Sequence, residues 1–411
     1  MALLHQTANT VLFSAHADRG HFNWAVPLAR AVRAAGLKAE LWTNGMCTAW
    51  APDGAFDVVE GTSFGEGKQL HAFVGAYKSF AGNYDSDREA RKAFCDNEGK
   101  GFASLCEKLG VDPTGFALMS TGGQAGQDAF AARAREPDVA FVVWEANWGA
   151  HAQKAAQAAL RPHMGLCPSY RCPYRAAYAE EPIPEFDGTD RVRNTQADIR
   201  FDGGGSLDVA FITAACLQGR AKDTGGRKRF GAFLPPRGES GDGDLGSDLA
   251  AWLAKEGRVT VISLGSQSCL QGIAPWAEAD LLKGCLAGSP RVLVASAAVP
   301  EDAELRRAEA EGRLRAEAWL PLLAVLGHSS VGCFVSHCGA NSTHESLAQG
   351  KAIVPLPFFD DQFYVAGVVE EAMGYASQEG YTPLRKAALR QGEGAGVAAV
   401  QAAVRRGPPG P

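Results

Sequence analysis

Residues 319–362 of this chain read WLPLLAVLGHSSVGCFVSHCGANSTHESLAQGKAIVPLPFFDDQ, and this stretch is the main basis for predicting the fold. In it, an apolar run passes through a His-Cys-Gly turn at 337–339 into a segment typical of a helix. A second apolar run follows and leads to the pair Asp361-Gln362. A strand that enters a helix through such a turn presents backbone N–H groups and the positive end of the helix dipole. We therefore expect an α/β unit with an anion site at this turn, where Gly339 lets the backbone come close.

The composition is that of an ordinary soluble globular protein. The chain has 411 residues, of which 46% are hydrophobic and 21% charged, and its formal net charge is −6. Because a single core stops growing near about 250–300 residues, we expect two domains. The acidic balance, without a basic stripe, argues against nucleic acid or an anionic membrane as a partner. The 10 cysteines form no CxxC pair and are expected to be reduced thiols.

The sequence predicts neither a membrane span nor a secretion signal. No apolar stretch approaches the roughly 20 residues that are needed to cross a bilayer. The N-terminal segment has no Lys or Arg before Arg19, and polar residues interrupt its apolar region. We therefore expect a cytoplasmic protein, and we expect it to be a monomer.

Short apolar runs alternate with amphipathic segments, which is typical of parallel α/β units. Strands are expected at 10–15, 39–43, 139–144, 258–264, 291–296, 332–336 and 352–356, and helices at 23–35, 151–160 and 275–286. The aromatic, Arg-rich stretch 163–205 is interpreted as an irregular wall over a pocket. A segment rich in Pro, Gly and acid at 235–247 is the expected linker between domains 1–234 and 248–385. Residues 386–411 are expected to form a disordered tail.

The 319–362 run resembles the donor-site signature of family 1 (UDP-dependent) glycosyltransferases of the plant or microbial secondary-metabolite or sterol type. The resemblance implies the α/β GT-B fold, in which two Rossmann-like parallel-sheet domains face each other across a cleft. It implies that the N-terminal domain binds an acceptor and that the C-terminal domain binds a nucleotide sugar. It also implies that a UDP-sugar is the co-substrate and that no cofactor or metal is needed.

The resemblance assigns donor-site roles to single residues of this chain. The residues that would line the diphosphate are Gly265, Ser266, His337, Gly339, Asn341 and Ser342. Glu345 would bind the ribose hydroxyls, and Trp319 would stack on the uracil. Asp361 and Gln362 would bind the hydroxyls of the sugar.

Two residues depart from the family's pattern, and two of the assigned roles have a purely structural alternative. Leu322 and Ala340 stand where the family commonly has Gln and Trp, so the identity of the sugar is left open. Ser342 and Glu345 also match a capping box, which would give them only a role in starting the helix. Trp319 could equally be a plain core residue.

The acceptor side is expected beyond the first strand, where the sequence SAHADRGHFNW resembles the family's Gly-His-x-Asn-Pro turn. His21 takes the position of the general base, and Trp24 stands where the family has Pro. A catalytic histidine needs an acid to orient it and to stabilise its charged form. Glu145, at the end of the 139–144 strand, matches the family's acid, which is commonly Asp. His16 is the competing histidine.

Metal and nicotinamide chemistry are disfavoured by the sequence. His337, Cys338 and His344 lack the usual spacing of zinc ligands, and His344 is expected to be partly exposed. No GxGxxG turn follows a strand in the way that a dinucleotide fold requires.

The sequence therefore predicts an inverting, metal-independent transfer of a hexose from a UDP-sugar to a hydroxyl of a small lipophilic acceptor, with His21 as the general base. Two alternatives remain open. One is a nucleotide-sugar-binding protein with impaired catalysis, which the short segment after Gln362 suggests. The other is a different GT-B transferase or an epimerase.

Overall fold

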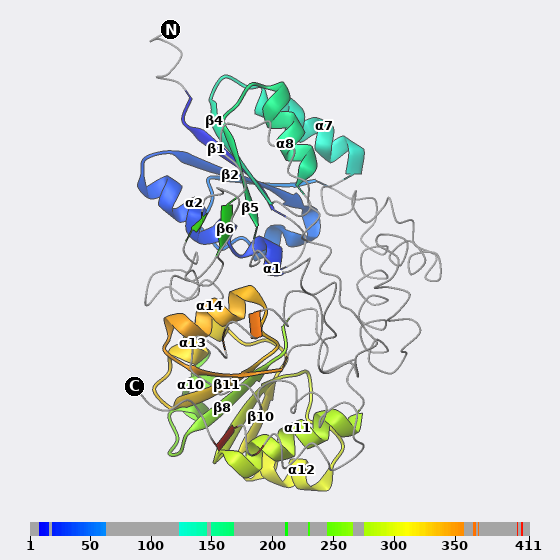
Figure 1. Cartoon of the computed structure of the whole chain (residues 1–411), viewed down its shortest axis with the longest axis vertical. Coiled ribbons are helices and arrows are strands. Elements are labelled where there is room, and N and C mark those ends of the chain that lie inside the picture. The colour runs from blue at the N-terminus through cyan, green and yellow to red at the C-terminus, as the bar shows by residue number, and fades with distance from the viewer. Residues whose placement is uncertain are drawn as a thin grey trace, which may run out of the picture. The chain divides into compact units, whose positions relative to one another are not determined.

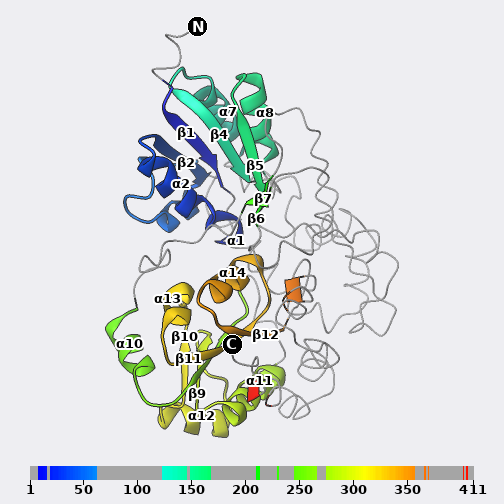
Figure 2. The ribbon, with the colours of Figure 1, turned by 60° about the vertical axis from the view of Figure 1, so that its left-hand side comes forward.

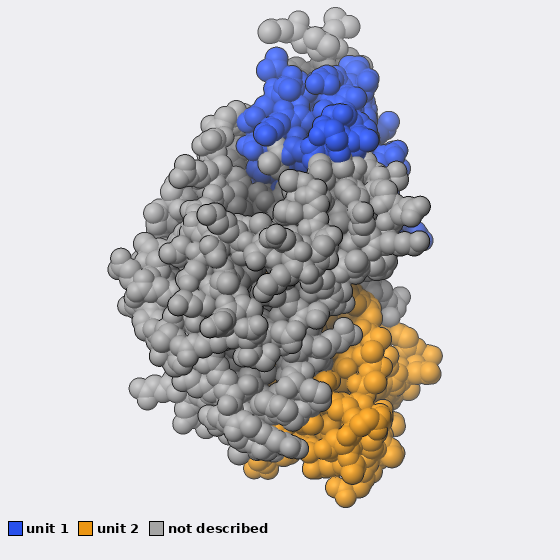
Figure 3. All heavy atoms as spheres, turned by 90° about the vertical axis from the view of Figure 1, so that its right-hand side faces the viewer, with its two compact units in different colours: residues 1–76, 97–173, 195–235 blue, residues 77–96, 174–194, 236–411 orange. Residues whose placement is uncertain are grey.

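The computed structural model of the chain describes residues 8–15, 19–62, 123–145, 149–167, 210–212, 229–230, 245–265 and 275–356, with residues 365–366, 369, 401 and 404–405. The chain divides into two compact units, which are coloured separately in Figure 3. The described elements up to β7 belong to unit 1, and those from α10 onward belong to unit 2.

Unit 1 is built on a parallel sheet of seven strands in the order β3-β2-β1-β4-β5-β6-β7. The strands are β1 (Thr10–Ser14), β2 (Lys38–Asn44), β3 (Val58–Thr62), β4 (Val139–Glu145), β5 (His163–Cys167), β6 (Ala210–Ile212) and β7 (Arg229–Phe230). The helices are α1 (Arg19–Phe22), α2 (Ala25–Ala34), the 3-10 helix η1 (Gly45–Trp50), α7 (Gly123–Ala134) and α8 (Ala150–Ala158).

Side chains alternate along the strands of unit 1, and the core is therefore divided between the two faces of the sheet. Phe13 and Leu41 pack with residues of α2 on one face. Leu12 and Trp144 pack with residues of α7 and α8 on the other. Figures 1 and 2 show α7 and α8 together on one side of strands β1 and β4. Burial on both faces explains the nearly continuous apolar runs that predicted these strands.

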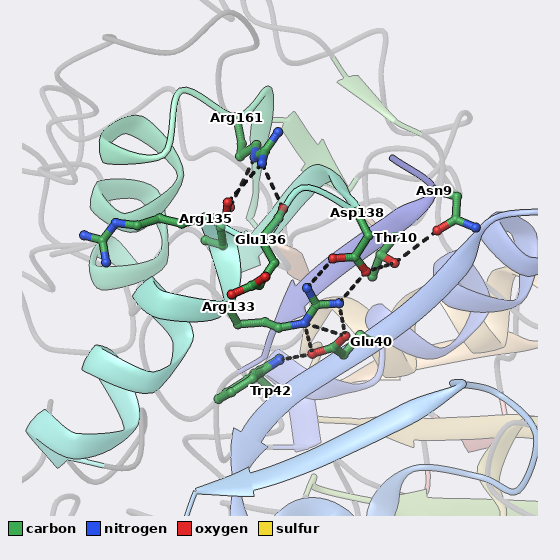
Figure 4. Close-up of polar contacts among 10 residues, drawn as sticks. Asn9, Thr10, Glu40, Trp42, Arg133, Arg135, Glu136, Asp138 and Arg161 are labelled. Atoms are coloured by element: carbon green, nitrogen blue, oxygen red, sulfur yellow. Dashed lines mark hydrogen bonds and ion pairs between the residues drawn. The ribbon is translucent and has the colours of Figure 1, made fainter. Parts of the chain in front are cut away.

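Arg133 joins α7 to the amino-terminal part of the sheet (Figure 4). Its guanidinium lies 2.8 Å from Oε2 of Glu40 and 2.7 Å from Oδ1 of Asp138. The hydroxyl of Thr10 also donates to Asp138, at 2.9 Å. The hydrogen bond from Arg133 lowers the pKa of Asp138 to about 2. Thr10 and Asp138 lie where β1 and β4 begin, opposite the carboxyl ends where ligands of such sheets bind, so the network is structural.

Unit 2 is built on a parallel sheet of five strands in the order β10-β9-β8-β11-β12. The strands are β8 (Val259–Ser263), β9 (Arg291–Ala295), β10 (Leu314–Glu317), β11 (Val331–Ser336) and β12 (Ala352–Pro355). The helices are α10 (Ser247–Leu253), α11 (Pro275–Gly288), α12 (Ala303–Ala310), α13 (Leu322–Gly327) and α14 (Ala340–Ala348). Apolar side chains of α11 and α12 fill one core cluster, and those of α10 and α13 fill another.

A buried arginine donates hydrogen bonds to the backbone carbonyl groups at the carboxyl-terminal end of α10. Arg291, the first residue of β9, is 5% exposed. Its guanidinium donates hydrogen bonds to the carbonyl oxygens of Trp252, Leu253, Lys255 and Gly257. The last carbonyl groups of a helix have no partner within the helix, and here a strand residue supplies their donors.

Every strand and helix that the sequence predicted is present, with bounds that differ by no more than two residues. The interpretation of 163–205 as an irregular wall is wrong at its start, because His163–Cys167 forms β5 and pairs in parallel with β4. That strand was missed because His163 and Gly165 interrupt its short apolar pattern. Residues 168–205, most of the expected linker and most of the expected tail lie outside the described residues.

Candidate functional site

Each sheet has one point at which the order of its strands reverses. In unit 1 this point lies between β1 and β4, and in unit 2 it lies between β8 and β11. Ligands of open parallel sheets bind beyond the carboxyl ends of the strands at such a point. The paired strands end together there, because Ser14 lies opposite Trp144 and Ser336 lies opposite Ser263. The predicted site residues must therefore be sought directly beyond these four strands.

In unit 1, the reversal point brings together His21 and Glu145. His21 lies in α1, shortly after β1, and Glu145 is the last residue of β4. Nδ1 of His21 is 3.0 Å from Oε1 of Glu145. The side chain of Glu145 is 1% exposed, whereas that of His21 is 19% exposed. A buried carboxylate beside a partly exposed imidazole can orient the ring and stabilise its protonated form.

Two residues that sequence reasoning missed hold the backbone on either side of this pair. The indole N–H of Trp24 donates to the carbonyl oxygen of His21 at 2.7 Å, and Trp24 is only 1% exposed. The backbone N–H of Gly149 donates to the carbonyl oxygen of Glu145 at 2.7 Å. A Cβ at Gly149 would lie 2.4 Å from that oxygen, so no other residue fits there without a shift. The only sign of these two backbone contacts in the sequence is that Trp24 stands where the family's turn has a proline.

A second histidine that the sequence did not single out lies at the same reversal point. Nε2 of His151, in α8, is 3.4 Å from the hydroxyl oxygen of Ser14 at the end of β1. Its ring meets Phe130 edge-on, with the ring centroids 5.8 Å apart. Burial lowers the pKa of His151 to about 4, so this ring is neutral at pH 7. The competing residue His16 lies outside the described residues.

In unit 2, the ring of His337 lies between the turn after β8 and the start of α14. A Cβ built on Gly265 would lie 2.6 Å from Nε2 of His337, and one on Gly339 would lie 2.3 Å from it. Burial lowers the pKa of His337 to about 4, and the backbone of Ser263 acts in the opposite direction. The ring is therefore neutral at pH 7. Its Nδ1 is enclosed and makes no hydrogen bond within the described part of the chain.

The turn that carries His337 ends at the amino terminus of a helix. Gly339 is the N-cap of α14 and has no side chain with which to cap the first backbone N–H groups. His337 as a whole is half-buried. A helix amino terminus next to a half-buried, neutral imidazole is a suitable place for an anion with hydrogen-bond acceptors.

The structure overturns three expectations for this region. Trp319, on the turn after β10, is 48% exposed, so the alternative of a plain core residue is wrong. The helix α14 begins at Ala340, and the hydroxyl of Ser342 donates to the carbonyl oxygen of Gly339 at 3.2 Å. Ser342 is therefore not an N-cap, and the capping-box alternative is wrong. His344 is 2% exposed rather than partly exposed, because α14 packs against α13, β11 and β12.

The other donor-site candidates divide into described and undescribed residues. Asn341 and Glu345 are half-buried in α14. Leu322 and Ala340, which depart from the family pattern, are 8% and 6% exposed. Ser266, Asp361 and Gln362 lie outside the described residues. Across the described ranges, no helix is both long enough and apolar enough to span a membrane.

Comparison with known proteins finds sequence similarity that lies mainly in unit 2. Residues 244–379 match the sequence model of the family described as UDP-glucoronosyl and UDP-glucosyl transferase. Crocetin glucosyltransferase 3 of Crocus sativus is 42% identical over 73 residues, which are 18% of this chain and 15% of that protein. Indole-3-acetate beta-glucosyltransferase of Zea mays is 35% identical over 162 residues, 38% of this chain and 32% of that protein. These matches span less than a third of the length of either curated relative.

Solved structures extend the likeness in fold to nearly the whole chain. Os79 from O. sativa, in complex with U2F and trichothecene, has a TM-score of 0.62 at 20% identity, covering 97% of this chain and 94% of that chain. Residues 244–379 of unit 2 therefore carry the sequence signature of the UDP-glucuronosyl and UDP-glucosyl transferases, and the chain has the GT-B fold.

Proposed function

We propose that the protein transfers a hexose from a UDP-sugar to a hydroxyl group of a small lipophilic acceptor. The observation that carries this proposal is the 3.0 Å contact between His21 and the buried Glu145 at the reversal point of unit 1. Such a pair is the chemistry that deprotonation of an acceptor hydroxyl requires. The family model that unit 2 matches and the names of the similar proteins support the class of donor.

The donor diphosphate would bind at the turn between β11 and α14, beside Gly265, and Ser266 would be a further neighbour of the phosphates. The ring of His337, neutral at pH 7, would contribute a hydrogen bond rather than a full charge. The amino terminus of α14, with Asn341 and Ser342, would then balance the phosphate charge. With this division of roles, the proposed transfer would need no metal.

The nucleoside and the sugar would be held by residues around that turn. The exposed indole of Trp319 supports a role as the platform on which the uracil stacks. Glu345 would accept hydrogen bonds from the ribose hydroxyls, and Asp361 and Gln362 would bind those of the sugar. The buried side chains of Leu322 and Ala340 offer the donor no polar group.

The reaction would be a single displacement with inversion at the anomeric carbon. His21 takes the proton of the acceptor hydroxyl, and the oxygen forms a bond to the anomeric carbon as the bond to UDP breaks. Glu145 stabilises the imidazolium that results. The UDP oxygen receives the electron pair of the broken bond, next to the positive end of α14.

A donor-binding experiment tests the first half of this proposal. Calorimetric titration with UDP, UDP-glucose, UDP-galactose, UDP-glucuronate and a dTDP-sugar should show binding of UDP and of at least one UDP-sugar. Trp319→Ala should weaken UDP binding about tenfold, because stacking on an aromatic ring is worth about 1–3 kcal/mol. Trp319→Phe should retain most of the affinity. If no donor binds to the unmodified chain, the proposed donor class is wrong.

A further inference from the structure

The ring of His337 occupies space that two glycines leave open. One, Gly265, follows β8, and the other, Gly339, precedes α14. A Cβ at either position would lie within 2.6 Å of Nε2 of His337, which is far inside van der Waals contact. Nε2 of His337 is thus the atom nearest to an added Cβ at both glycines.

The backbone conformation explains why glycine is favoured at position 265, but it does not explain glycine at position 339. Gly265 has a φ of +85°, in the left-handed region that favours glycine, so it would be strained as any other residue. Gly339 has φ −62° and ψ 145°, an extended conformation that every residue adopts readily. The described contact that alanine would violate at position 339 is the contact with the ring of His337.

The turn itself is held in an unfavourable backbone conformation. Cys338 has a φ of +63°, in the left-handed region that is unfavourable for a residue other than glycine. Its side chain is fully buried, and its backbone N–H donates to the hydroxyl of Ser336 at 3.0 Å. The turn between β11 and α14 is therefore fixed on both sides of His337, at Ser336 and at Cys338.

We propose that Gly265 and Gly339 are positioning residues, because the absence of a side chain at both positions leaves the space that the His337 ring occupies. Gly339 would then act on donor binding through His337 rather than by contact with the donor. This inference rests on the proposed function, because it takes the turn between β11 and α14 as the diphosphate site. Nδ1 of His337 is enclosed and has no hydrogen bond within the described residues, so no partner at this atom sets the position of the ring between the two glycines.

A double-mutant cycle on UDP affinity tests the proposal. Gly339→Ala in the unmodified chain should displace the ring and raise the Kd for UDP about tenfold, the effect of losing one hydrogen bond to a charged group. His337→Ala should raise it by a similar factor. In the His337→Ala background, Gly339→Ala should change the Kd by less than about twofold, because the ring that the methyl group would meet is gone.

Gly246 provides a matched control. It is the N-cap of α10, its φ of −59° and ψ of 150° are close to those of Gly339, and an added Cβ would meet nothing within 4 Å. Gly246→Ala therefore makes the same change of N-cap residue without a ring to displace. It should leave the Kd for UDP unchanged. Should His337→Ala not fold, as judged by circular dichroism, His337→Asn takes its place, because its side chain ends short of the Nε2 position.

The outcomes separate this proposal from the proposed function. If the unmodified chain binds no UDP, the diphosphate site is wrong and the positioning role falls with it. If it binds UDP and Gly339→Ala weakens binding equally in both backgrounds, the glycine acts directly on the donor and the positioning role is contradicted. An unchanged Kd for Gly339→Ala in the unmodified chain also contradicts it.

Discussion

At the scale of single residues, the position of His21 depends on a hydrogen bond from a tryptophan side chain. Trp24 stands where the family's turn has a proline, and its indole N–H donates to the carbonyl oxygen of His21. A proline fixes a turn by restricting its own φ. In this chain the buried ring of Trp24 packs against Phe13, with the ring centroids 6.4 Å apart, and restrains the turn through its side chain instead.

Trp24→Phe should therefore slow sugar transfer more than it weakens donor binding. Phenylalanine keeps most of the apolar packing but leaves the carbonyl of His21 without this donor. We expect kcat to fall about 10- to 100-fold, because a shift of about 1 Å in a catalytic group can have that effect. The KM for the UDP-sugar should stay unchanged. Steady-state kinetics with one donor and one acceptor measure both quantities.

Trp252→Phe is the control for this prediction. The indole of Trp252 donates to the carbonyl oxygen of Gly312 at 3.0 Å and is 6% exposed, but it lies in unit 2. It should lower the free energy of unfolding by about 1–3 kcal/mol, as loss of a buried hydrogen bond does, without changing kcat. Equal effects of the two substitutions on kcat would contradict a positioning role for Trp24.

The residues that sequence reasoning found differ in kind from those that it missed. His21 and Glu145 could be predicted because each follows a clear apolar strand, and the carboxyl ends of parallel strands meet at one edge of a sheet. Trp24 and Gly149 donate to carbonyl oxygens three and four residues earlier in the chain, and His151 contacts Ser14, which is far away in the sequence. The residue types alone do not show that these contacts form. Their roles appear only when distances are known.

At the scale of elements, the β11–α14 segment contains two histidines that are neutral when folded. Burial lowers the pKa of His337 and of His344 to about 4 each. An unfolded chain protonates histidine near pH 6.5, so between these values the unfolded state binds more protons than the folded state. Stability is therefore complete above about pH 6.5 and is lost as the pH falls toward 4.

His344→Gln should make unfolding less sensitive to acid. Between about pH 7 and pH 4.5, a buried histidine with these pKa values removes about 2–3 kcal/mol from the free energy of unfolding. Urea unfolding at the two pH values should show a fall for the unmodified chain that is larger than the fall for His344→Gln by about this amount. An identical fall in the two proteins would show that His344 is not the source of the acid sensitivity.

The elements that could be predicted are those with strong apolar patterns. Strands β1, β4, β8 and β9 are buried along nearly their whole length and appear as continuous apolar runs. By contrast, β3 is an edge strand with Val58 and Val59 partly exposed, and its sequence VVEGT is only half apolar. Such strands are fixed by pairing with a neighbour, which a local pattern does not reveal.

At the scale of the whole molecule, two sheets of different size share one organisation. Each is parallel, each reverses its strand order once, and each carries its candidate residues directly beyond the two strands at that reversal. The sequence predicted two α/β domains and the GT-B fold, and the fold is confirmed by comparison with solved structures. Cytoplasmic location, monomeric state and the roles of single site residues stay predictions.

Whether this chain transfers sugar with His21 as the base can be measured as the rate of product formation from a UDP-sugar and a panel of small alcohols and phenols. We predict that the unmodified chain forms a glycoside. We predict that His21→Ala still binds UDP with the same Kd but forms product about 10²- to 10⁴-fold more slowly, the usual contribution of a general base. Binding of UDP without any transfer by the unmodified chain, or equal rates in the two proteins, would contradict the claim.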